Sequence, residues 1–234
     1  MSSKDRKLNS IINNIPDSKG TNAYYRDKSF SKLLEFYSGK DMLSKIESKF
    51  VELGEIVGSE LEDLALSADK NSPKLSKRSR DGSFTNTIEK HPDFIKLEKY
   101  AFEKFGLAAM SHRHGVFGMQ QALPPIVKYG LTFLFVQSEF GLCCPLSMTD
   151  SLTRTLKKFG ENKLIDKFFD QLTSQNLDDL FQGGMFMTEQ HAGSDVGSID
   201  TYAENIDGEW YLTGDKWFCS NPDADLAMVL ARYD

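Results

Sequence analysis

Residues 1–40 are polar and carry few periodic apolar positions, whereas apolar residues recur at helical spacing over much of residues 42–180. From Met42 onward they recur every three or four positions, which predicts an amphipathic helix with Asp41 as its N-cap. The residues of this stripe are Ile46, Phe50, Leu53 and Val57. Ser59 and Glu62 have the spacing of a capping box and predict a second helix that runs through Leu66.

A long polar stretch, residues 67–91, interrupts the helical pattern. It contains Pro73, Gly82 and a basic cluster. The cluster comprises Lys74, Lys77, Arg78 and Arg80. These positive charges could contact phosphate, but no aromatic residues alternate with them to stack on bases. We therefore predict a solvated loop.

Helical spacing resumes at Pro92, which predicts the start of the next helix. Its apolar face comprises Phe94, Leu97, Ala101, Phe105 and Ala108. Residues 123–136 are largely apolar, but they are too short to span a bilayer and contain Lys128, so they predict a buried helix. Two more helices follow, the first ended by Gly160 and the second capped by Asn162.

Beyond residue 180 the hydrophobic period changes toward two, which is typical of strands. The predicted extended segments are 201–206, 209–213, 216–221 and 226–231, the last of them a buried strand. Asp207-Gly208 is a hairpin signal between the first two. The chain ends directly after the last segment, so we expect a fragment whose sheet is completed by further chain.

These patterns predict an α+β protein with more than one domain. An N-terminal arm (1–40), which includes a short aromatic helix packed on the body, precedes a helical domain (41–180). An incomplete β middle domain (181–234) follows.

Composition narrows the class of protein without defining its chemistry. The net charge of −6 gives no general case for binding nucleic acid or an anionic membrane. The 3 cysteines form neither a disulfide framework nor a CxxC metal pattern, which favours a reducing compartment such as the cytoplasm. The N-terminal residues are polar and charged, and no apolar signal core follows them.

Two local patterns suggest a metal site and a cysteine nucleophile, but the rest of the sequence supports neither. His112-x-His114 resembles a pair of metal ligands, but no third ligand stands at a recognisable spacing, so we expect a helix end or a domain contact. Cys143 and Cys144 have no base nearby in the sequence, and cysteine is commonly a small core residue. We predict neither a metal ion nor a cysteine nucleophile.

The stretch Gly183–Asp195 carries the strongest candidate chemistry. A short apolar run leads to Thr188, and a turn at Gly193-Ser194 follows. Small residues let backbone N–H groups approach a ligand, and the hydroxyls add donors. The stretch alone fits either a loop that binds a flavin edge or a phosphate, or a plain turn between domains. A second signal at Gly214–Asn221 favours the ligand-binding loop.

The two stretches together resemble the signature of the acyl-CoA dehydrogenase family. The matching residues are Met187-Thr188-Glu189, Ala192-Gly193-Ser194-Asp195 and Gly214-Asp215-Lys216-Trp217-Phe218-Cys219-Ser220-Asn221. Three further features resemble the AidB-like, alkylation-response branch of the family. They are Glu139-x-Gly141-x-x-Cys144-Pro145-x-x-Met148-Thr149, Ser72-Pro73 before His91-Pro92, and Lys216-Trp217-Phe218-x-Ser220. The resemblance implies the N-terminal helical domain and the start of the β middle domain, with the C-terminal helical domain missing.

In that family these stretches bind FAD, so the resemblance implies a set of cofactor-binding residues. The set is Met185, Met187, Thr188, Gly193, Ser194, Phe218, Cys219 and Ser220. The resemblance implies that Thr188 hydrogen-bonds the pyrimidine edge of the flavin and that the Ser220 hydroxyl lies near N5. Ser194 would lie near the pyrophosphate or the start of an acyl thioester, which also makes it the expected substrate-binding residue.

The catalytic base is expected outside this chain. In the family it lies in the C-terminal domain or in a helix leading into it, so no catalytic residue is assigned here. Glu189 is expected to be structural, and Asp195 to be a turn or cap residue. Phe218 replaces the more usual tryptophan, which implies weaker stacking on the flavin.

Three hypotheses for function follow. The favoured one is a parent enzyme of fatty acid metabolism that oxidises the Cα–Cβ bond of an acyl-CoA with hydride transfer to FAD, of which this fragment alone has little or no activity. The second is a DNA-associated flavoprotein whose DNA contacts lie outside this segment. The third is a truncated, non-catalytic product that serves as a scaffold. The expected partners are FAD, an acyl-CoA and, in the parent, further copies of the same chain, with no membrane.

Overall fold

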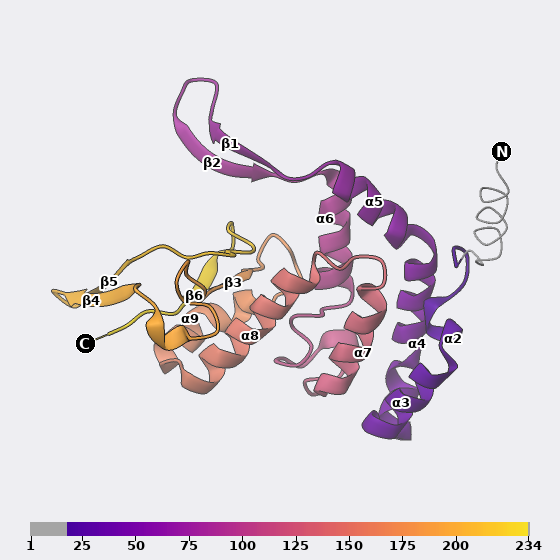
Figure 1. Cartoon of the computed structure of the whole chain (residues 1–234). Helices are drawn as coiled ribbons and strands as arrows, with labels where there is room; N and C mark the ends of the chain where they lie inside the picture. The colour runs from indigo at the N-terminus through magenta and orange to yellow at the C-terminus, as the bar shows by residue number, and fades with distance from the viewer. Residues whose placement is uncertain (1–17, 234) are drawn as a thin grey trace, which may run out of the picture.

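The computed structural model describes residues 18–233, so residues 1–17 of the expected arm lie outside that range. Helices α2–α7 lie at one end of the molecule, and strands β3–β6 lie beside α8 and α9 at the other, which agrees with the predicted α+β class (Figure 1). The helices are α2 (Ala23–Arg26), α3 (Lys28–Ser38), α4 (Lys40–Ile56), α5 (Glu62–Lys70), α6 (Pro92–Glu98), α7 (Pro125–Phe135), α8 (Cys143–Phe159) and α9 (Asn162–Leu172). The strands are β1 (Lys74–Arg78), β2 (Phe84–Glu89), β3 (Gly183–Phe186), β4 (Tyr202–Ile206), β5 (Glu209–Thr213) and β6 (Leu226–Val229).

Three predicted helix caps are wrong. Asp41 lies in the first turn of α4 without capping it. Ser59 donates to the Glu55 carbonyl at 2.7 Å and forms no capping box. The reason is that α4 continues into α5 through a π-helical turn (Val57–Leu61), so no helix begins there. Asn162 is the first residue of α9 and its side chain makes no cap hydrogen bond.

The described part of the expected arm belongs to the helical body. The Gly20 amide donates to the Gly58 carbonyl at 2.7 Å, and a Cβ at Gly58 would collide with the Thr21 carbonyl. Glycine therefore lets the two backbones cross closely. Beyond this crossing Tyr24 and Leu34 are buried, so α2 and α3 are packed against α4.

The apolar residues predicted for the segments that begin at Met42 and Pro92 are buried in the core of the helical part or packed against it. The second segment is helical only to Lys104, because α6 continues as a π-helix (Lys99–Lys104), so Phe105 and Ala108 lie beyond the helix on which they were predicted. On the segment that begins at Pro92, four of the predicted residues are fully buried and Phe94 is half-buried. These four are Leu97, Ala101, Phe105 and Ala108. Helix α7 is buried as predicted, and Gly130 lies so close to Phe50 that a Cβ would approach its ring within 2.9 Å. Among the described residues, no helix is long and apolar enough to cross a membrane.

The loop predicted over residues 67–91 is wrong, because α5 extends to Lys70 and an antiparallel hairpin of β1 and β2 follows. Figure 1 shows this hairpin projecting from the helices. Leu75 and Ile88 are paired across the two strands, but most of the hairpin is exposed. Exposed strands carry no alternation between core and solvent, which is the pattern that sequence interpretation relies on. The basic cluster lies on this exposed hairpin, as its predicted solvation requires.

The strands after residue 180 form two separate ladders. β4 and β5 make the predicted hairpin across Asp207-Gly208, and β3 pairs with β6 in parallel. The predicted extended segment 216–221 is instead an irregular loop, so Cys219 is not in a strand. Phe218 has a φ of 56°, which takes the backbone out of the strand region. β6 is half-buried and shorter than the predicted buried strand.

Candidate functional site

The first motif loop starts from a strand that is fixed against the helical part. The Gly183 amide, at the start of β3, donates to the Thr149 hydroxyl on α8 at 2.9 Å. A Cβ at Gly183 would lie 3.0 Å from the Thr149 Cα, so the strand and the helix are in close contact. From β3 the chain runs into residues 187–195, and it returns through residues 214–221 to β6. The parallel pairing of β3 with β6 thus holds both ends of the segment that contains the two motifs.

The Glu189 carboxylate lies at the centre of this segment and is almost fully buried. Its Oε1 atom accepts hydrogen bonds from the Lys216 ammonium at 2.6 Å and from the Thr201 amide at 3.0 Å. Its Oε2 atom accepts from the Asp200 amide at 2.5 Å, and the Thr201 hydroxyl donates to Oε1 as well. One side chain therefore joins three stretches of the chain that are distant in sequence.

These contacts give the Glu189 carboxylate a structural role. The Lys216 ammonium, followed by the Thr201 hydroxyl and the Asp200 amide, lowers the pKa of Glu189 to about 2. The group is thus ionised across the physiological range, with its lone pairs occupied by donors. The structure confirms the structural role expected for Glu189.

Lys216 and Trp217 bring the second motif against the first. The Lys216 ammonium also donates to the Met187 carbonyl at 3.1 Å, and the Trp217 amide donates to the Thr188 carbonyl at 2.8 Å. A Cβ at Gly214 would collide with Thr201, so glycine is needed where the returning chain passes. The two stretches that resemble a cofactor signature are therefore neighbours in space.

A second polar network connects the end of the second motif with the helical part. The Asn221 side-chain nitrogen Nδ2 donates to Oε1 of Gln182 at 3.2 Å, and Nε2 of Gln182 donates to the buried Glu98 on α6 at 3.1 Å. Lys90, which follows the projecting hairpin, donates to the same Glu98 oxygen at 3.0 Å and lies 3.6 Å from Asp223. Residues 221–223 are thus attached to α6 through Glu98.

Several of the residues predicted to bind a cofactor have side chains that are exposed or make no hydrogen bond within the described part of the chain. Met187 is 39% exposed and Phe218 is 81% exposed. Within residues 18–233, the hydroxyls of Thr188, Ser194 and Ser220 form no hydrogen bond with another protein group. The remaining predicted residues differ. Met185 is half-buried within the β3–β6 pair, and the Cys219 thiol is directed to the Lys216 carbonyl at 3.4 Å.

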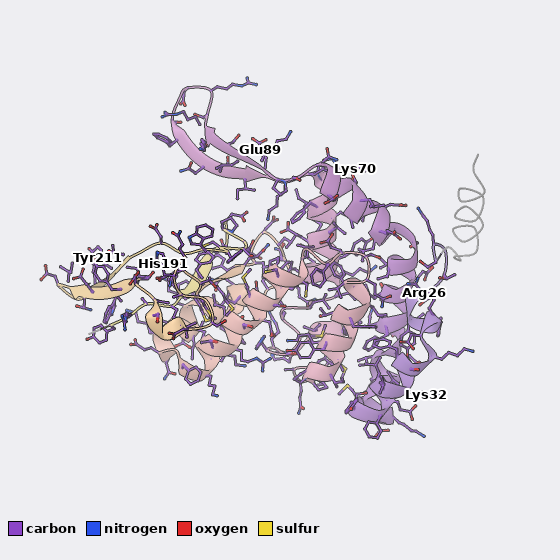
Figure 2. The ribbon with its side chains drawn as sticks, viewed as in Figure 1. Arg26, Lys32, Lys70, Glu89, His191 and Tyr211 are labelled. Carbon is purple, nitrogen blue, oxygen red and sulfur yellow. The ribbon has the colours of Figure 1, made fainter. Side chains whose placement is uncertain are left out.

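In the described part of the chain, the end of the first loop, residues 191–195, is not bonded to the second loop. The Asp195 carboxylate accepts from the Gly197 amide at 3.2 Å and from the Ser198 hydroxyl at 2.6 Å, which confirms the expected cap role. A Cβ at Gly193 would meet no protein atom within 4 Å. Ser194 is exposed, and the described structure shows no hydrogen bond between Gly193 or Ser194 and residues 216–220. His191, in the same loop, is also exposed (Figure 2).

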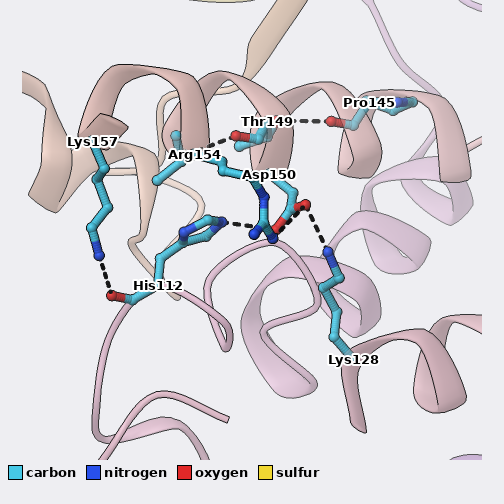
Figure 3. Close-up of polar contacts among 8 residues, drawn as sticks. His112, Lys128, Pro145, Thr149, Asp150, Arg154 and Lys157 are labelled. Atoms are coloured by element: carbon cyan, nitrogen blue, oxygen red, sulfur yellow. Dashed lines mark hydrogen bonds and ion pairs between the residues drawn. The ribbon is translucent and has the colours of Figure 1, made fainter. Parts of the chain in front are cut away.

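A buried charged cluster in the helical part was missed by the sequence interpretation. Asp150 on α8 accepts from Lys128 of α7 at 2.6 Å and lies 2.8 Å from the His112 ring (Figure 3). Burial by itself would raise the pKa of Asp150, but the hydrogen bonds from His112 and Lys128 hold it below its ordinary value. His112 lies in a turn between the helical segments, and its contact with Asp150 joins that turn to α8 within the helical part, so the expectation of a helix end or a domain contact is wrong. Among the described residues, no cluster of His, Cys, Asp and Glu has the arrangement of a metal site.

Two family profiles match the chain along its length. Residues 13–179 match the Adaptive response protein AidB N-terminal domain, and residues 184–234 match the middle domain of acyl-CoA dehydrogenases. The boundary between these matches coincides with the region where helices give way to strands.

Individual relatives agree with the profiles. Acyl-CoA dehydrogenase family member 11 of Caenorhabditis elegans is 30% identical over 216 residues, which cover 90% of this chain and 34% of that protein. The AidB protein of Escherichia coli is 29% identical over 182 residues, which cover 73% of this chain and 32% of that protein.

Solved structures show the same relationship. The crystal structure of Caenorhabditis elegans ACDH-11 in complex with C11-CoA superposes with a TM-score of 0.79 at 28% identity, over 92% of this chain and 36% of that one. The structure described as the Bd2924 apo-form gives a TM-score of 0.80 at 25% identity. The chain spans about a third of the length of the curated relatives that it matches. With an AidB-type N-terminal domain and part of the middle domain, the chain belongs to the acyl-CoA dehydrogenase family.

Proposed function

We propose that this chain supplies the helical domain (41–180) and the first part of the β domain (181–234) of an FAD-dependent acyl-CoA dehydrogenase. The observation that carries the proposal is the direct contact between the two motif loops through Lys216, Glu189 and Trp217. A ligand that binds both motifs would therefore find the two loops adjacent before it binds.

The open groups on the loops support FAD as that ligand. The free hydroxyls of Thr188 and Ser220 can donate to a polar ring edge, and the exposed Phe218 and Met187 offer apolar surface to a flat ring. Phe218 combines high exposure with a positive φ, a combination that is costly without a function. Among the described residues the Gly193 backbone N–H donates no hydrogen bond to another backbone group, and a Cβ there would meet no protein atom within 4 Å, so this N–H is open to a phosphate.

Within this proposal the residues bind and orient but do not abstract a proton. Bound FAD would accept a hydride from Cβ of the acyl-CoA. Thr188 would hold the pyrimidine edge, Ser220 would lie near N5, and Ser194 would bind the pyrophosphate or the start of the thioester. Glu189 accepts four hydrogen bonds and Asp195 caps a turn, so neither is proposed as the base, and the base is proposed to lie in another part of the parent protein.

The acyl-CoA is proposed as substrate because the relative ACDH-11 was crystallised with C11-CoA. Assembly into a homo-oligomer is proposed for the parent protein on the basis of family membership. A cytoplasmic location is proposed from the 3 cysteines, which form no disulfide framework. Binding of DNA by this segment is not proposed, since its net charge is −6 and its basic cluster lies on a single hairpin.

The test is uptake of FAD by the purified chain, followed by flavin fluorescence and by the absorption bands of the bound flavin. We expect saturable binding that is weakened in Ser220→Ala and Thr188→Val. Ser79→Ala, on the projecting hairpin, is a control that should leave binding unchanged. A chain that never takes up FAD while its helical circular dichroism is normal would contradict the proposal and favour a non-catalytic scaffold. Robust turnover of acyl-CoAs by residues 1–234 alone would contradict the absence of the base.

A further inference from the structure

The two motif loops, residues 187–195 and 214–221, have one solvent-exposed face and one buried face. The side chains of Lys216 and Glu189 are each only 7% exposed, whereas Phe218, two residues after Lys216, is 81% exposed. The ion pair is therefore placed behind the surface that the loops present to solvent.

Lys216 is suited to this position by the length and charge of its side chain. One ammonium group reaches the Glu189 carboxylate at 2.6 Å and the Met187 carbonyl at 3.1 Å, which lie on successive parts of the first loop. The next amide in the chain, that of Trp217, is bonded to the Thr188 carbonyl at 2.8 Å. The residues on either side of Thr188 are thus both attached to the second loop.

None of these contacts needs a ligand. The Glu189 carboxylate is also held by the Thr201 and Asp200 amides, so the acceptor is fixed before Lys216 meets it. Groups that are held in place before binding lose little conformational freedom when a ligand arrives. A loop pair of this kind can set the distance between two binding segments in advance.

We propose that Lys216 and Glu189 are positioning residues that fix the spacing between Met187-Thr188 and Phe218-Ser220, the two segments that contact the flavin. They act through the backbone and do not touch the ligand. The identity of the ligand rests on the proposed function, whereas the positioning role concerns the protein itself.

The first arm of the test measures FAD affinity by quenching of flavin fluorescence in wild type, Lys216→Met and Lys216→Arg. Methionine retains the length of the side chain but cannot donate, so we expect FAD binding to weaken by roughly tenfold to a hundredfold, as for other residues that orient a binding group from behind. Arginine can reach both acceptors and should restore most of the affinity. Lys96→Met removes the 2.6 Å ion pair with Glu60 on the helices and is the matched control.

The second arm uses the ligand-free chain and measures hydrogen exchange of the peptides that cover residues 186–192 and 214–221. Lys216→Met should exchange faster in both, and Lys216→Arg and Lys96→Met should match wild type. Unchanged exchange in Lys216→Met would overturn the proposal, and so would unchanged FAD affinity in a chain that binds FAD. If wild type binds no FAD, the proposed function fails, and the exchange arm still decides whether Lys216 positions the loops.

Discussion

The helical part and the strand part of this chain are stabilised in different ways. Nearly all buried apolar side chains lie before residue 181, and among the described residues after it only Ala192 and Ile199 are buried hydrophobics. The strand part exposes large apolar side chains instead, among them Tyr211 on the β4–β5 hairpin (Figure 2). Others are Tyr202, Ile206, Trp210 and Leu212. The candidate site is thus built from hydrogen bonds and an ion pair, and it is attached to a domain that contains the hydrophobic core.

The largest expected change in stability distinguishes a buried side chain of the helical part from an exposed side chain of the strand part. Phe50 is 0% exposed and Trp210 is 57% exposed. Phe50→Ala should lower the free energy of unfolding by about 4 kcal/mol, because it removes a fully buried ring and leaves a cavity. Trp210→Ala should change it by less than about 0.5 kcal/mol. Urea unfolding followed by far-UV circular dichroism measures both, and equal losses would show that the strand part is packed as tightly as the helical part.

A smaller loss is expected at the charged cluster of the helical part. Asp150→Ala leaves Lys128 buried without its carboxylate partner, which should cost about 3 kcal/mol at neutral pH. The pKa of Asp150 is lowered in the folded state, so its stabilising contribution is complete above the pKa of the unfolded chain, about 4, and is lost as the pH falls through the folded value. The difference between wild type and variant should therefore shrink in acid. A difference that is independent of pH would contradict this account.

The smallest loss of stability is expected where β3 of the strand part is bonded to α8 of the helical part. Thr149→Val removes the acceptor of the Gly183 amide, and a buried donor without a partner costs about 1–2 kcal/mol. Both tryptophans, Trp210 and Trp217, lie in the strand part, so their fluorescence reports on it while circular dichroism reports on the helices. We expect the fluorescence transition to move to lower urea than the helical transition. Thr153→Val is the control, because its hydroxyl bonds within α8 and should shift both probes together.

Regular helices and the β4–β5 hairpin could be predicted from sequence because their signals are local. A largely apolar run predicted α7 as a buried helix, and Asp207-Gly208 predicted the turn between β4 and β5. The β1–β2 hairpin could not be predicted, since an exposed ribbon has no face that alternates with a core. The capping box at Ser59 failed because tertiary packing carries the helix through that point as a π-helical turn.

The candidate site was predictable as a set of motifs but not as a geometry. Thr188, Phe218 and Ser220 were selected from signatures that can be recognised in one line of sequence. The partners of Glu189 could not be, because Lys216 lies 27 residues away and Thr201 lies 12 residues away. The partners of Asp150 could not be predicted for the same reason, since His112 comes from a turn and Lys128 from α7, 38 and 22 residues away in sequence. Contacts of this kind depend on the fold and leave no local pattern.

The parallel pairing of β3 with β6 has a consequence for the order of events during synthesis. Gly183 is paired with Leu226, and both motif loops lie between these residues. When Thr188 and Glu189 have just been synthesised, the first motif cannot yet adopt its folded conformation, because strand β6, which closes the loop, has not been made. The entropy of closing that loop is lost in one step, when β6 arrives. Until then the helical part can fold on its own core, and the ability to bind a cofactor should appear late and all at once.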